Sequence, residues 1–75
     1  MIIDGAEFTS EVVYFQEIPY VLLIYKNGNT CFRVDRRVTA NRTTFKVRHV
    51  GNYTLSSGQF EYALSEASRF VNEMV

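Results

Sequence analysis

The chain has 75 residues, of which 47% are hydrophobic and 15% aromatic, and its formal net charge at pH 7 is zero. This composition excludes a disordered tail and predicts one folded domain near the lower size limit for a self-sufficient core. One cysteine and one histidine exclude an internal disulfide and a metal site built from such ligands. The start lacks a basic flank and a long apolar run, so we expect no signal peptide, no membrane interaction and a cytoplasmic location.

The zero total hides an uneven distribution of charge. Seven of the eight basic residues lie between positions 26 and 48, where Asp35 is the only acid. Residues 1–25 carry a net charge of −4 and residues 49–75 one of −2. Such polarity in a small domain indicates an interaction surface. The seven basic residues are Lys26, Arg33, Arg36, Arg37, Arg42, Lys46 and Arg48.

Alternating side chains and turn signals predict strands in the first two-thirds of the chain. The first two strands are rich in β-branched and aromatic residues, and Pro19 separates them as at an edge, bulge or bend. Asn27-Gly28 is typical of a type I′ hairpin turn, because both residues tolerate positive φ. The expected strands are residues 12–18, 20–26, 30–38 and 43–50.

The C-terminal segment has the clearest helical pattern. Apolar residues recur at spacings of three and four, which predicts a helix over residues 57–74. Ser56 and Gln59 match a capping box at its start. We therefore predict an α+β fold, a three- to four-stranded antiparallel meander with one C-terminal helix packed on one face, as a single domain over residues 1–75. The expected apolar stripe of the helix is Phe60, Ala63, Leu64, Ala67, Val71 and Met74.

Strand periodicity assigns side chains to the two faces of the sheet. The Asn27-Gly28 turn places Leu23 opposite Phe32, and the next loop places Arg33 opposite Arg48. The face beneath the helix also receives a partly buried, hydrogen-bonded histidine opposite Phe32. The apolar residues expected on this face are Val21, Leu23, Phe32, Val34, Phe45 and Val47, and the histidine is His49.

The opposite face is expected to carry cations, among them a pair of like charges directly across the ladder. Like charges in this position destabilise by some tenths of a kcal/mol unless they reach solvent or share an anion. We weigh a solvated basic face, a phosphate-binding face and a surface for an acidic protein. An apolar patch on the same face predicts a protein interface, unless residues 1–11 cover it as a flap. The charged residues are Arg33, Asp35, Arg37, Lys46 and Arg48, and the patch is Tyr20, Leu22 and Ile24.

Several short motifs resemble a known DNA-binding module. They are Ile24-Tyr25-Lys26-Asn27-Gly28, Cys31-Phe32-Arg33, and Gly51 with Tyr53-Thr54 leading into a helix that holds Ala63 and Ala67. Over about residues 22–70 the chain is similar to the sheet-plus-helix domains of phage tyrosine integrases (the arm-site-binding domain) and of AP2-type transcription factors. The resemblance implies that three strands enter the DNA major groove and that the helix packs behind them. It implies groove-facing Arg33, Arg37, Lys46 and Arg48, with Lys26 and Arg42 at the rim.

No motif for catalysis accompanies these residues. Cys31 and His49 are expected on different faces, which excludes a nucleophile–base pair, and phosphate-loop, zinc and GxSxG patterns are absent. We expect no enzyme, no catalytic residue, no metal and no cofactor. The favoured function is a binding module for nucleic acid or a nucleoprotein complex. A duplex is favoured over a single strand, because Phe32 and Phe45 point to the core and leave the basic face without aromatic side chains.

Two other classes of function remain open. A phage-type inhibitor or adaptor, similar to anti-CRISPR proteins in size and architecture, would bind a host protein. It would use the apolar patch of Tyr20, Leu22 and Ile24, the acidic side of the helix or the basic face. A structural homodimer would instead join through that patch or through strand edges.

Overall fold

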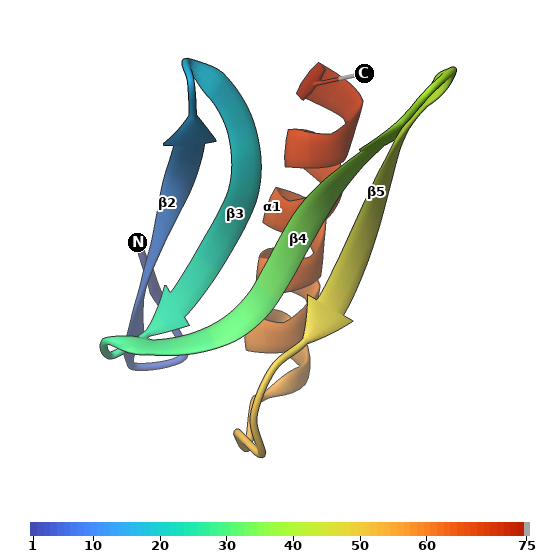
Figure 1. The fold of residues 1–75 in the computed structure, drawn as a ribbon. Helices are drawn as coiled ribbons and strands as arrows, with labels where there is room; N and C mark the ends of the chain where they lie inside the picture. Colours follow the sequence, from blue (N-terminus) through green and yellow to red (C-terminus); the bar gives the residue numbers. More distant parts are fainter. Residues whose placement is uncertain (75) are drawn as a thin grey trace.

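The computed structural model describes residues 1–74, which form a five-stranded antiparallel sheet and one helix (Figure 1). The strands lie side by side in chain order, so the sheet is an open meander. The expected α+β class and the C-terminal helix are confirmed, but the sheet has five strands and not the expected three to four. The elements are β1 (Ile2–Ile3), β2 (Ala6–Phe15), β3 (Ile18–Lys26), β4 (Asn29–Thr39), β5 (Arg42–His49) and α1 (Ser57–Met74).

Tight turns with left-handed backbone connect the first four strands. Both central residues have positive φ in Asp4-Gly5 (49° and 81°), Gln16-Glu17 (50° and 66°) and Asn27-Gly28 (48° and 84°). This is the backbone pattern of a type I′ turn, whose twist matches that of the flanking strands. The turn expected at Asn27-Gly28 is confirmed.

The second of these turns changes the expected strand boundaries. The chain reverses at Gln16-Glu17, so the expected strand at residues 12–18 is wrong. Neither residue is a glycine or asparagine, and the sequence therefore carries no turn signal there. Pro19 lies inside β3. Residues 1–11 form β1 and the first part of β2 instead of a flap.

A β-bulge in β4 determines which residues face the helix. Close to the turn, Tyr25 pairs with Thr30 in the expected register. The next pair along the ladder is Ile24 with Phe32, so Cys31 is an extra residue in β4. One extra residue in β4 reverses the face on which the β3 residues before Tyr25 lie, relative to the β4 residues after Cys31.

The bulge overturns the faces that we expected for β3. Leu22 and Ile24 are 4% and 1% exposed and belong to the core, so they do not form the expected protein interface. Val21 and Leu23 were expected in the core, but their ladder partners lie on the opposite face. Tyr20 remains 48% exposed.

The core lies between α1 and the inner side of β2, β3 and β4. On the helix, Ala63 and Ala67 are buried as expected, and their small side chains let α1 lie close to the sheet. Gln59 and Phe70 are buried as well, which shifts the buried stripe away from the expected one. Phe45 packs edge-on against Phe70 at a ring-centroid distance of 6.2 Å. The residues expected in the core that are exposed are Val47, Phe60, Leu64 and Met74.

The capping box at the start of α1 is confirmed, and its Gln59 also binds the β1–β2 turn. Gln59 N donates to Ser56 Oγ at 3.2 Å, and Ser56 N donates to Gln59 Oε1 at 3.0 Å. Gln59 is 5% exposed, and its Nε2 donates to the carbonyl oxygens of Ile3 at 2.9 Å and Asp4 at 3.3 Å. These bonds hold the first turn of the helix against the β1–β2 turn.

We expect Gln59→Ala to lower the free energy of unfolding by about 2–3 kcal/mol, because the partly buried carbonyl groups of Ile3 and Asp4 lose a donor and the cap is broken. Urea denaturation followed by circular dichroism measures this loss. Glu61→Ala, at an exposed helix position, is the matched control and should change stability by less than about 0.5 kcal/mol. Equal effects of the two substitutions would contradict the structural role of Gln59.

Glu17→Gly should raise the free energy of unfolding by about 0.5–1 kcal/mol, because an L-residue in left-handed backbone costs more than the added glycine flexibility. Gly28→Ala tests the same backbone effect in the opposite direction, because it removes a glycine from left-handed backbone. No atom lies within 4 Å of the added Cβ, so its expected loss of about 1 kcal/mol comes from the backbone alone. Thermal denaturation measures both. A lower melting temperature for Glu17→Gly would argue against the type I′ turn.

Candidate functional site

The side of the sheet that α1 leaves uncovered, here called the outer face, presents a cluster of cations. Arg33 pairs directly with Arg48 across β4 and β5, in the expected register. Asp35 pairs with Lys46 two positions further along. Because alternate residues of a strand share a face, all of the cations of these two strands except the half-buried Arg36 lie together there. They are Arg33, Arg37, Arg42, Lys46 and Arg48.

Asp35 connects the two arginines at the centre of this cluster. Its Oδ1 accepts a hydrogen bond from Nε of Arg33, and its Oδ2 lies 3.7 Å from Nε of Arg48. The Asp35 side chain is 20% exposed, whereas those of the two arginines are 50% and 55% exposed. The shared carboxylate reduces the repulsion between two directly paired cations. The trio keeps a net charge of +1, and much of each guanidinium remains in solvent.

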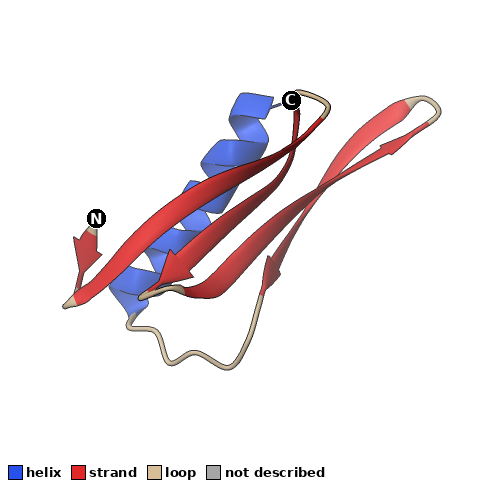
Figure 2. Cartoon of the chain, turned by 60° about the vertical axis from the view of Figure 1, so that its left-hand side comes forward, coloured by secondary structure: helices blue, strands red, loops and turns tan. Residues whose placement is uncertain are grey.

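The β4–β5 hairpin carries the cations away from the body of the molecule. Figures 1 and 2 show its closed end diverging from α1 and from the β2–β3 hairpin. The pairing explains this, because the β3–β4 ladder ends at Val21 and Asp35 whereas the β4–β5 ladder continues to Thr39 and Arg42. Residues 29–49 hold six basic residues and one acid, a net charge of +5.

Two basic residues of the strands lie away from the outer face. Lys26, which the resemblance placed at the groove rim, donates from Nζ to the carbonyl oxygen of Thr54 at 2.8 Å and so fastens the loop before α1. Arg36 lies on the helix side of β4, and its Nη1 donates to the carbonyl oxygen of Pro19 at 3.5 Å. Its buried Nε has no hydrogen-bond partner within residues 1–74. Arg36 thus joins β4 to β3 where the two strands separate.

Cys31 and His49 differ in burial, and no hydrogen bond joins them within residues 1–74. Cys31 is fully buried in the core, contrary to its expected place on the outer face, and burial raises the pKa of its thiol more than nearby Lys26 lowers it. His49 lies opposite Phe32 as expected, but it is exposed and not partly buried. Its ring packs on Phe32 at a centroid distance of 5.1 Å, and no side-chain hydrogen bond involves it in the described part of the chain.

We expect the Cys31 thiol of the folded protein to react with Ellman's reagent at least about 100-fold more slowly than that of the urea-unfolded protein. The thiolate is the reactive form, and burial both disfavours it and blocks access, so reaction requires local opening. The absorbance of the released thiolate measures both rates. Similar rates in the two states would show that Cys31 is not enclosed in the core.

A second feature of the surface lies at the closed end of the β2–β3 hairpin. Val13, Tyr14, Phe15 and Tyr20 line a hollow of about 390 Å³. Tyr14 and Phe15 are 63% and 64% exposed. Sequence reasoning missed both because it continued their strand to residue 18 and predicted no turn beside them. A second irregularity in register, between Val13 and Tyr14, bends the hairpin at this hollow.

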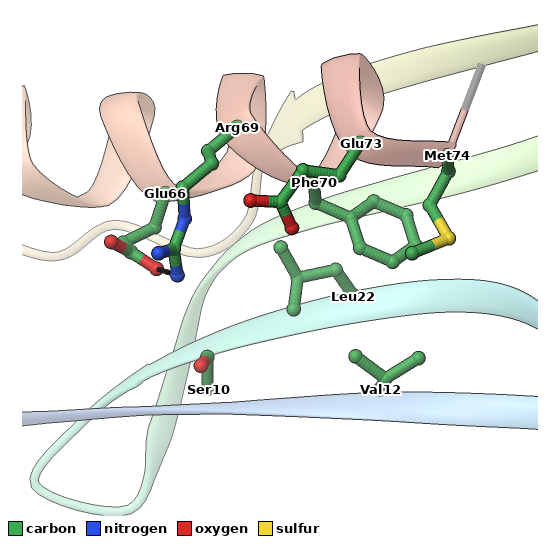
Figure 3. Close-up of a pocket in the computed structure, with 8 residues that line it drawn as sticks. All are labelled: Ser10, Val12, Leu22, Glu66, Arg69, Phe70, Glu73 and Met74. Atoms are coloured by element: carbon green, nitrogen blue, oxygen red, sulfur yellow. Dashed lines mark hydrogen bonds and ion pairs between the residues drawn. The ribbon is translucent and has the colours of Figure 1, made fainter.

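A smaller hollow of about 120 Å³ lies between α1 and the β2–β3 hairpin (Figure 3). Leu22 and Phe70 give it an apolar floor. At its rim, Nη2 of Arg69 lies 2.6 Å from Oε2 of Glu66, and the Glu73 carboxylate lies nearby (Figure 3). The acids outnumber the cation, so this hollow does not suit an anionic ligand.

Residues 1–74 contain no group of three or more metal-ligating side chains. Within the same described range, no helix is long and apolar enough to cross a membrane. Comparison with protein-family models, curated proteins and solved structures gave no significant match. The function is therefore inferred from the geometry and charge of the outer face.

Proposed function

We propose that this chain is a non-catalytic binding module that holds nucleic acid, alone or in a nucleoprotein complex, through the outer face of β4 and β5. The observation that carries the proposal is the gathering of five exposed cations on one uncovered face of the sheet. Arginine forms charge-assisted, often bidentate hydrogen bonds with phosphate. A row of such side chains along a strand therefore suits a repeating polyanion.

The shape of the hairpin supports the same proposal. A two-stranded ribbon fits the major groove of DNA, and the β4–β5 hairpin projects beyond the helix (Figure 1). The resemblance to the integrase and AP2-type domains points to the same face, because in those domains the helix packs behind the strands that meet DNA. Here α1 also packs behind β3 and β4.

The alternative partners have less support from the observed surfaces. The expected apolar interface is reduced to Tyr20, because Leu22 and Ile24 are buried. Pairing of two copies through the edge of β5 would bring Lys46 and Arg48 of each copy together, and charged edge strands of this kind oppose pairing. An acidic host protein would use the same cations as nucleic acid does, so binding measurements must separate the two.

We expect the double variant Arg33→Ala, Arg48→Ala to bind a labelled 20-base-pair duplex at least about 10-fold more weakly than the wild type at roughly 50 mM salt. Each lost phosphate contact lowers the slope of log affinity against log salt by about 1, so the slope should fall by about 2. Fluorescence anisotropy over a salt series measures both quantities.

Arg69→Ala is the matched control, because it removes a cation from the helix and should change affinity by less than about twofold. Asp35→Asn should act in the opposite direction and strengthen binding, since it releases both guanidinium groups. A wild type that binds neither this duplex nor a single strand of the same length at about 50 mM salt would reject nucleic acid and favour an acidic protein partner. Wild-type affinity in the double arginine variant would reject the outer face.

A further inference from the structure

The hollow of the β2–β3 hairpin adjoins the outer face that carries the cations. Val13, which lines the hollow, pairs with Val21, Val21 pairs with Asp35, and Asp35 pairs with Lys46. Residues paired directly across neighbouring strands share a face of the sheet. One row of side chains therefore crosses four strands, from the hollow to the cations. At about 4.8 Å per strand, the row is roughly 14 Å long.

Burial along this row supports its continuity. Val21 is 7% exposed, yet it does not belong to the core cluster beneath α1. Neighbouring side chains of the outer face must cover it, which makes the row a continuous surface. At one end of the row the aromatic residues remain open to solvent, with Phe15 and Tyr20 64% and 48% exposed.

Given the proposed function, we infer that the bound nucleic acid is single-stranded, with bases stacked on the aromatic hollow and phosphates held by the cations of β4 and β5. Non-specific single-strand binding requires both components on one face, aromatic side chains for the bases and cations for the backbone. A duplex keeps its bases stacked inside and would leave the hollow without a ligand. A single strand occupies both parts of the outer face at once.

This inference revises the preference for a duplex, which the sequence and the shape of the β4–β5 hairpin both indicated. That preference depended on Phe32 and Phe45 pointing to the core, and the structure confirms that both pack there. An outer-face aromatic residue comes instead from the β2–β3 hairpin, because Phe15 lies on the same face as Val13 two residues before it. The unrecognised turn at Gln16-Glu17 brings Phe15 and Tyr20 together around one hollow.

An acidic residue, Glu11, sets the direction in which the bound single strand of nucleic acid lies. Glu11 pairs with Leu23 and so stands on the outer face, on the hairpin opposite the cations. Its Oε2 accepts a hydrogen bond from the Tyr25 hydroxyl at 2.9 Å, which raises the pKa of that phenol. The carboxylate repels phosphate from this part of β2. The sugar-phosphate backbone of the nucleic acid is thereby kept over β4 and β5, and its bases point toward the hollow.

Three probes with the same label separate the contributions of bases and phosphates: a 12-residue oligo-dT, an abasic oligomer of the same length, and a 12-base-pair duplex. Stacking contributes about 1–3 kcal/mol per base, so we expect the wild type to bind oligo-dT at least about 10-fold more tightly than the abasic oligomer. The double variant Phe15→Leu, Tyr20→Leu should lose that difference and keep its affinity for the abasic oligomer. Phe60→Leu, at an exposed aromatic residue of α1, is the matched control and should bind as the wild type does.

The outcomes distinguish this inference from the proposed function. Equal binding of oligo-dT, abasic oligomer and duplex, unchanged in the Phe15→Leu, Tyr20→Leu variant, would overturn the single-strand inference and leave nucleic-acid binding intact. Absence of binding to all three probes would overturn both. Sedimentation velocity tests the other possible occupant of the hollow, a second copy of this chain. A wild-type dimer that the same variant converts to a monomer would show that a second copy fills the hollow, and would also overturn the inference.

Discussion

Cys31, the extra residue in β4, is the constraint on which the arrangement of both faces depends. Because of this bulge, Leu22 and Ile24 lie beneath the helix while Arg33 and Asp35 stay outside. Full burial of one such aliphatic side chain contributes about 1.5–3 kcal/mol, so the correct side for two of them matters to a domain of this size. The same shift in register brings Val21 and Leu23 to the outer face and gives it an apolar middle.

The outer face is consequently graded from acidic to basic across the strands. One row runs from Glu11 on β2 through Leu23 on β3 to Arg33 and Arg48 on β4 and β5. A polyanion is repelled at one side of this row and attracted at the other. For the proposed nucleic-acid ligand, the gradient favours one orientation on the face, which a uniformly basic surface would not do.

The polar contacts that fasten the fold lie at the opposite end from the two diverging hairpins. Gln59 ties the start of α1 to the β1–β2 turn, and Lys26 holds the loop that precedes the helix. The closed ends of the β2–β3 and β4–β5 hairpins lie at the other end of the molecule (Figure 1). Where β3 and β4 separate, Arg36 of β4 donates a hydrogen bond to the Pro19 carbonyl oxygen of β3. A fastened base and two projecting hairpins suit a binding module that reaches around an extended ligand.

Local patterns in the sequence determined the helix at residues 57–74, its capping box and the register of β4 with β5, including the pairing of Arg33 with Arg48. Each of these depends on residues a few positions apart, so periodicity and turn chemistry suffice to predict them. Periodicity and turn chemistry also sufficed to predict that Arg33, Arg37, Lys46 and Arg48 share one face.

Only the tertiary structure decided the bulge at Cys31, and with it the burial of Leu22 and Ile24. β3 is apolar on both sides, so its own sequence does not distinguish the two faces, and the choice depends on which residues meet α1. The sequence did not predict the aromatic hollow, for a related reason. The turn at Gln16-Glu17 lacks the residues that usually mark one, and its left-handed backbone is held by the pairing of the strands on either side.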